Sequence, residues 1–123
     1  MTKGHCLCGA IEWLADAALT GAAVCHCGQC RRQSGHVWAS AMVPCGALTI
    51  IGTPTWFGAS AAAQRGFCAT CGSFLFWRAE GEDTISVSLG SIEAPTGVAL
   101  EKHIFTSDKG DYYDIADNVP IES

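Results

Sequence analysis

Charged side chains are scarce in this sequence, and basic ones are the scarcest. Only 15% of the 123 residues are charged, and 7 basic residues stand against 12 acidic ones, giving a formal net charge of −5. Binding to a phosphate backbone needs a basic surface, so we expect no nucleic-acid partner. The chain is still unlike a disordered one, because 49% of its residues are hydrophobic. Its length suits a single domain over residues 1–123.

Long apolar runs are missing as well. No stretch approaches the roughly 18–20 apolar residues of a membrane-spanning helix. The first ten residues, MTKGHCLCGA, lack the apolar segment of a secretory signal peptide. We therefore expect a cytoplasmic protein with no membrane partner. In that reducing compartment, eight cysteines predict metal binding or catalysis before disulfide bonds.

Helical periodicity is the third absence. The best helix candidate is a turn or two after Gln29 that ends at Gly35. Short segments with strand character predominate instead, and they cover residues 10–15, 37–43, 47–52, 55–58, 73–78, 84–90 and 102–107. In the segment 84–90, Ile85, Val87 and Leu89 are expected to point inward and the serines outward. The sequence therefore predicts an all-β fold of short strands with little helix.

Seven of the eight cysteines fall into three clusters on the expected turns. They form a C-x-C pair, a C-x-C-x-x-C triple and a C-x-x-C pair, namely Cys6 and Cys8; Cys25, Cys27 and Cys30; and Cys68 and Cys71. Tight turns of this kind direct two sulfurs at one ion, and zinc prefers four thiolate or imidazole ligands. Cys45 stands alone, as a small buried hydrophobe or a turn residue. The clusters predict zinc binding.

The clustered cysteines divide between two ions in few ways. Joining the two pairs gives a closed site of four cysteines and leaves the triple with an open fourth position. Joining the first pair to the triple would leave Cys68 and Cys71 with two ligands only. The first division uses every clustered cysteine, and its metal binding energy would offset the entropy of closing a loop of roughly sixty residues. A closed site is structural, whereas an open position can admit water or a substrate.

Four stretches carry a resemblance to a known family. GHCLCGAIEW, CHCGQCRRQSG, RGFCATCGSFLFW and HIFTSDKGDYYDIADNVP follow one another between about residue 4 and residue 120. Together they resemble the glutathione-dependent formaldehyde-activating (GFA) family, which implies the all-β Mss4-like zinc-binding fold. The resemblance implies a structural zinc on Cys6, Cys8, Cys68 and Cys71, and a catalytic zinc on Cys25, Cys27 and Cys30. The implied activity is that of a carbon–sulfur lyase, which joins formaldehyde to a small thiol such as glutathione or reverses that step.

Other interpretations of the same residues stay open. His26 or a partner could fill the fourth position, and the chain would then be a non-catalytic zinc module that binds a protein. A redox dithiol at Cys27 and Cys30 lacks an accompanying βαβ pattern. Four cations near the motifs are candidates for the carboxylates of glutathione: Arg31, Arg32, Arg65 and Lys109. Arg65 could equally have a structural role. No partner for His36 or His103 is identifiable in the sequence.

Overall fold

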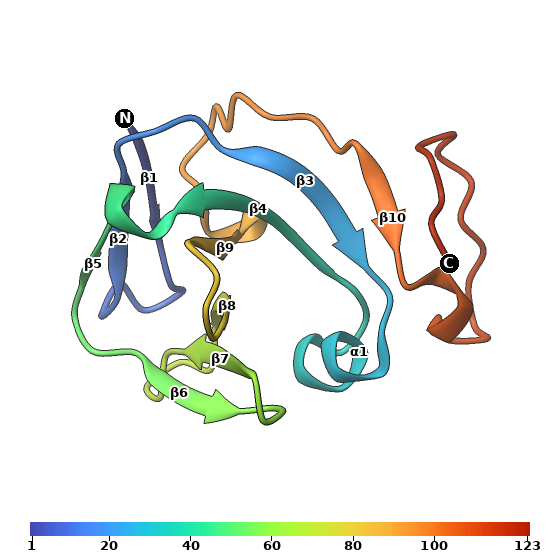
Figure 1. Cartoon of the computed structure of the whole chain (residues 1–123), viewed down its shortest axis with the longest axis horizontal. Helices are drawn as coiled ribbons and strands as arrows, with labels where there is room; N and C mark the ends of the chain where they lie inside the picture. The colour runs from blue at the N-terminus through green and yellow to red at the C-terminus, as the bar shows by residue number, and fades with distance from the viewer.

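Ten short strands and one helix of seven residues make up the fold, which confirms the all-β prediction. The computed structural model describes residues 1–123 (Figure 1). The strands are β1 (Thr2–His5), β2 (Glu12–Ala15), β3 (Thr20–Cys25), β4 (Trp38–Pro44), β5 (Leu48–Ile51), β6 (Thr55–Gly58), β7 (Ala63–Phe67), β8 (Phe74–Ala79), β9 (Thr84–Ser88) and β10 (Lys102–Ile104). The helix, α1, spans Gly28–Ser34, and single 3₁₀ turns lie at Cys45–Ala47, Leu89–Ser91 and Thr106–Asp108. No helix is long and apolar enough to cross a membrane.

The helix forms where the sequence predicts it, and its two ends have local causes. Cys27 is the N-cap residue, and its sulfur accepts a hydrogen bond from the backbone N–H of Cys30. Gly35 ends the helix in the left-handed conformation at φ 89°, and its N–H donates to the carbonyl of Arg31. Two residues of the cysteine triple, Cys27 and Cys30, are thereby built into the start of the helix.

A small antiparallel sheet has the order β1-β2-β5. Its centre is Trp13 of β2, which is completely buried and donates its indole N–H to the hydroxyl of Ser91 at 3.0 Å. The indole lies against Gly4 of β1, where an added Cβ would come within 2.3 Å of the ring. The β1–β2 connection, which carries the first cysteine pair, starts from this tightly packed base.

The large sheet has the order β10-β3-β4-β9-β8-β7-β6 and curves through the molecule (Figure 1). All of its neighbouring strands are antiparallel except β10 and β3. In that parallel pair, His103 lies opposite Val24 and Ile104 opposite Cys25. The pairing therefore brings the C-terminal part of the chain beside the start of the cysteine triple, about eighty residues earlier.

Two clusters of buried side chains form the core. The main cluster of eleven residues includes Trp13, Leu75, Phe76 and Val87 together with Cys6 and Cys68. A second cluster joins Cys25 and Cys30 to Trp38 and Phe74, whose rings stack with centroids 4.0 Å apart. Each candidate metal site is thus continuous with a hydrophobic cluster, which excludes water from one side of it.

The predicted strands are confirmed with shifted ends, but the expectation that the serines of β9 point outward is wrong. Ser86 and Ser88 are buried like Ile85 and Val87, so both faces of β9 are covered. Among the aromatic side chains, Trp13, Trp38, Phe74 and Phe76 are buried, whereas Trp56 and Trp77 are half-buried and pack against the two core clusters.

Candidate metal centres

The two cysteine pairs meet in one group, as the closed-site division predicts. Cys6 and Cys8 lie on the β1–β2 connection, and Cys68 and Cys71 on the β7–β8 connection. Their four sulfurs all lie within 4.8 Å of one another. Each turn ends in a glycine with positive φ, Gly9 at 81° and Gly72 at 82°, a conformation that a residue with a Cβ rarely adopts.

The sulfur spacing in this group fits a tetrahedral ion. Four thiolates at about 2.3 Å from zinc are about 3.8 Å apart along the edges of the tetrahedron. The Sγ atoms of Cys6 and Cys8 are 3.7 Å apart, as are those of Cys8 and Cys68. A pure sulfur donor set of this spacing suits zinc better than calcium or magnesium, which prefer oxygen.

Ser73 links the two turns around this group. Its hydroxyl oxygen accepts a hydrogen bond from the backbone N–H of Leu7 at 3.1 Å and lies 3.2 Å from the sulfur of Cys71. The Ser73 hydroxyl and backbone N–H lower the pKa of Cys71 to about 5. Hydrogen bonds of this kind favour the thiolate form that a metal binds. The sequence analysis did not identify Ser73, although this residue follows Cys71 by two positions.

The cysteine triple forms the second group. Cys25 is the last residue of β3, Cys27 is the N-cap of α1, and Cys30 lies in its first turn. Their three sulfurs lie within 4.8 Å of one another, and no fourth Cys, His, Asp or Glu donor joins them. Cys25 and Cys30 are buried, whereas Cys27 is partly exposed. The group can hold an ion with three sulfurs and leave a fourth position toward the exposed side.

Arg65 is buried against this second group. The side chain comes from β7 with only 4% exposure, and its Nη1 and Nη2 donate to the sulfur of Cys30 at 3.5 and 3.6 Å. Its remaining hydrogen bonds go to the side-chain oxygens of Gln29 and Gln33 on α1. The Cys25 thiol and the Arg65 guanidinium lower the pKa of Cys30 to about 6. A buried cation needs a negative partner, and the thiolates supply it.

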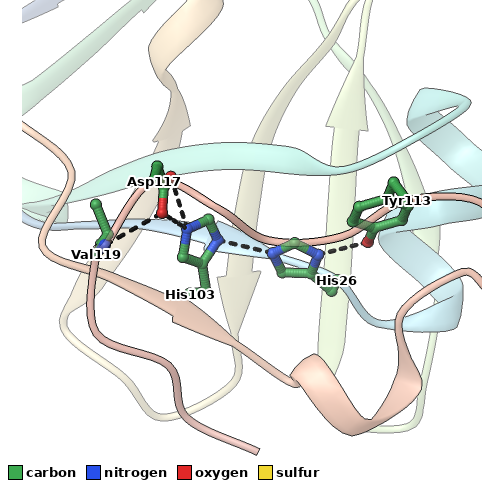
Figure 2. A network of polar contacts seen from close by, with 5 residues as sticks. All are labelled: His26, His103, Tyr113, Asp117 and Val119. Carbon is green, nitrogen blue, oxygen red and sulfur yellow. Dashed lines mark hydrogen bonds and ion pairs between the residues drawn. The ribbon is translucent and has the colours of Figure 1, made fainter.

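His26, between two cysteines of the triple, turns both ring nitrogens to other residues. Its Nδ1 lies 2.5 Å from the hydroxyl of Tyr113, and its Nε2 lies 2.8 Å from Nδ1 of His103 (Figure 2). Nε2 of His103 in turn lies 2.9 Å from the Asp117 carboxylate. His26 is 2% exposed and contributes no nitrogen to the cysteine group, so the interpretation that it fills the fourth position is wrong. Burial and the neighbouring His103 lower the pKa of His26, which keeps its imidazole neutral.

The remaining predicted cations lie around the helix and the C-terminal segment. Lys109 donates to the carbonyls of Gly110 and Tyr113, and its Nζ lies 4.8 Å from the Tyr113 ring centroid. Arg31 is half-buried, with an Nε that has no hydrogen-bond partner, whereas Arg32 is exposed. Cys45 is exposed in a 3₁₀ turn, which agrees with a turn residue and not with a buried one.

The C-terminal segment supplies residues that sequence reasoning missed. Tyr113 and Asp117 contact His26 and His103, and Tyr112 bonds His36 at 2.8 Å. The only sequence signal for them is the clustering of Tyr and Asp in the stretch DYYDIAD. Their partners depend on the parallel pairing of β10 with β3, which local patterns do not reveal.

Comparisons with known proteins agree with this geometry. A family model described as glutathione-dependent formaldehyde-activating enzyme matches residues 1–108, which include all seven clustered cysteines. A crystal structure of a Rhodobacter sphaeroides protein is similar, with a TM-score of 0.61 and 26% sequence identity. That likeness covers 79% of this chain and 90% of the other. No curated protein matches the chain.

Proposed function

Because the chain belongs to the glutathione-dependent formaldehyde-activating family, we propose that it is a zinc-dependent carbon–sulfur lyase. Its substrate is the adduct of a small thiol and an aldehyde, such as S-hydroxymethylglutathione, which it forms or cleaves. The observation that carries the proposal is the group of three sulfurs with no fourth protein donor. We assign zinc to both groups, with a structural role for Cys6, Cys8, Cys68 and Cys71, and a catalytic role for Cys25, Cys27 and Cys30.

Zinc at the open site would supply a Lewis acid that favours the thiolate of an incoming thiol or polarises an aldehyde. The protein's own contribution is to hold three sulfurs in place and to balance their charge. Three thiolates around one Zn²⁺ carry a total of about −1. The buried guanidinium of Arg65 beside Cys30 offsets that charge, so an anionic thiol meets less repulsion at the open position.

The surroundings of α1 suit a thiol that bears carboxylates. Arg31 and Lys109 both lie near Tyr113, and Nε of Arg31 is buried without a protein partner. Guanidinium and ammonium groups are the ordinary partners of carboxylates. Glutathione, with two carboxylates, is therefore the thiol we would test first. All eight cysteines are free, which suits a reducing compartment such as the cytoplasm.

The test is zinc stoichiometry and thiol-dependent turnover of the same preparations. Protein purified under reducing conditions should contain two zinc ions, and Cys27→Ser should contain one with the fold intact. Native protein should catalyse adduct formation from glutathione and formaldehyde above the uncatalysed rate, and Cys27→Ser should not. Two zinc ions without turnover for any aldehyde would overturn the lyase proposal and favour a zinc module that binds a protein.

A further inference from the structure

Two arginines lie beside the cysteine triple, and they differ in their partners. Arg65 is on the buried side, where it donates to the sulfur of Cys30 and to side-chain oxygens of α1. Arg31 follows Cys30 on α1 and is half-buried. No carboxylate of the protein pairs with Arg31. The fold therefore leaves one cation beside the triple without an anionic partner.

The Arg31 guanidinium lies on the exposed side of the triple. Helix positions four residues apart share a face, so Arg31 is on the face of Cys27, the partly exposed cysteine. The backbone N–H of Arg31 donates to the carbonyl of Cys27 at 2.9 Å. Helical side chains lean toward the preceding turn, and Nη2 of Arg31 lies 3.6 Å from where a Cβ on Gly28 would be. The guanidinium therefore covers the backbone next to Cys27.

The Arg31 side chain is held at its base and free at its tip. Its Nε is shielded from solvent and has no hydrogen-bond partner, so the stem lies against the protein. The two terminal nitrogens are not shielded in this way. They form a planar fork of donors that matches the two oxygens of a carboxylate. Because the stem is already packed, less conformational entropy is lost when a carboxylate binds there.

The other cations near the triple are less suited to this role. Arg65 is only 4% exposed, and its donors are directed at the sulfur of Cys30 and at two glutamine side chains. Lys109 donates to two backbone carbonyls. Arg32 is exposed, so solvent and salt screen its charge. Arg31 is the cation that combines partial burial with unpaired donors.

We propose that Arg31 binds a carboxylate of the thiol substrate and makes the site selective for thiols that carry one. The proposal rests on the proposed function and deepens it, because it names the substrate class and the residue that selects it. One helical turn separates Arg31 from Cys27, the cysteine on the exposed side, so one small molecule can reach both. The attraction is local, since the chain as a whole has a net charge of −5 and repels anions elsewhere.

The experiment removes the guanidinium from the protein and the carboxylates from the ligand. S-methylglutathione, which has no free thiol, and its diethyl ester are titrated by calorimetry into native protein and Arg31→Gln. Native protein should bind the acid about 10- to 100-fold more tightly than the ester, the range for hydrogen bonds to charged groups. Arg31→Gln should lose most of this preference. An undiminished preference in Arg31→Gln, or none in native protein, would overturn the proposal.

A matched variant and a kinetic ratio separate the outcomes. Arg32→Gln removes the same charge from the next position of α1 and should keep the native preference for the acid, with equal zinc content in all three proteins. In adduct formation with formaldehyde, the kcat/KM ratio of glutathione to neutral 2-mercaptoethanol should fall about 10-fold or more in Arg31→Gln. An unchanged ratio would overturn the selectivity while the lyase function stands. Binding of the acid through Arg31 without any turnover would overturn the lyase function and leave the carboxylate site.

Discussion

The guanidinium of Arg65 lies 3.5 Å from the sulfur of Cys30, although the two residues are 35 positions apart in the sequence. It is a buried cation whose nearest anionic group is a predicted metal ligand, and no carboxylate contacts it. Hydrogen bonds to a ligating sulfur orient it and adjust how strongly it holds the metal.

Replacement of Arg65 by Gln should weaken zinc binding at the open site by about 10- to 100-fold, the range for loss of an outer hydrogen bond to a ligand. The closed site should keep its ion, because no hydrogen bond links Arg65 to that group. Competition with a chromogenic chelator measures both affinities. Arg78→Gln is the matched control, since Arg78 is also an arginine beside an aromatic ring but contacts Gln64 and Trp56 at the surface. An equal loss of zinc affinity at the open site in Arg65→Gln and Arg78→Gln would contradict a specific role for Arg65.

Metal removal should proceed in two steps. The open group offers three protein sulfurs and the closed group four, so a chelator should take the ion from Cys25, Cys27 and Cys30 first. After the first step, far-UV circular dichroism should be unchanged, because β1–β2 and β7–β8 remain joined. After the second step, the thermal unfolding temperature should fall. Loss of both ions in one phase, with simultaneous unfolding, would mean that the two groups are not independent in stability.

A methyl group on Gly4 should destabilise the protein. The added Cβ would lie 2.3 to 2.5 Å from ring atoms of Trp13, which is fully buried and cannot move aside freely. Overpacking of this kind costs about 1–3 kcal/mol. Urea unfolding of Gly4→Ala measures the change, and Gly58→Ala on β6 is the control because its Cβ would meet nothing within 4 Å. Equal free energies of unfolding for Gly4→Ala and Gly58→Ala would show that β1 can move away from Trp13 without loss of stability.

The Asp117 carboxylate gives the stability an acid-dependent component. The hydrogen bond from His103, followed by that from the Val119 N–H, lowers the pKa of Asp117 below its ordinary 3.8. A lowered folded-state pKa contributes stability that is complete above the unfolded value and is lost as pH falls through the folded one. The unfolding temperature of native protein should therefore decline more between pH 5 and pH 2 than that of Asp117→Asn. The unfolding temperature of Asp114→Asn should depend on pH as that of native protein does. If native protein and Asp117→Asn showed the same pH dependence, the Asp117 carboxylate would not contribute to stability in this way.

The sequence predicts those parts of the fold that depend on local pattern. The strands around Phe76 and Val87 have strong β character, and Gly35 ends the helix as expected. The sequence pattern does not predict β1, β3 or β7. In β3, the residues TGAAVC include glycine and alanine, which have weak strand preference. Pairing with β4 on one side and β10 on the other stabilises this segment, so tertiary contacts outweigh local preference.

The cysteine groups were predictable, whereas the hydrogen bonds that join Asp117, His103, His26 and Tyr113 were not. Ligand spacing of one or two residues is a local signal, and the division into four and three follows from counting. His26 and His103 are 77 residues apart and meet only through the parallel register of β3 and β10. Burial of the serines beside Val87 also escapes prediction, because alternation cannot show whether a second face is covered.

Strand β7 connects the two candidate metal groups over a very short distance. Arg65 on this strand touches Cys30, and Cys68, the residue after the strand ends, belongs to the closed group. An ion at the closed group would hold that end of the strand in place. The conformational entropy that is lost when Arg65 is positioned beside Cys30 would then be smaller. This one short strand and the residue that follows it therefore carry both the cationic neighbour of the open group and a sulfur ligand of the closed group. If both groups bind zinc as proposed, the closed group with four sulfurs is expected to take up its ion before the open group with three.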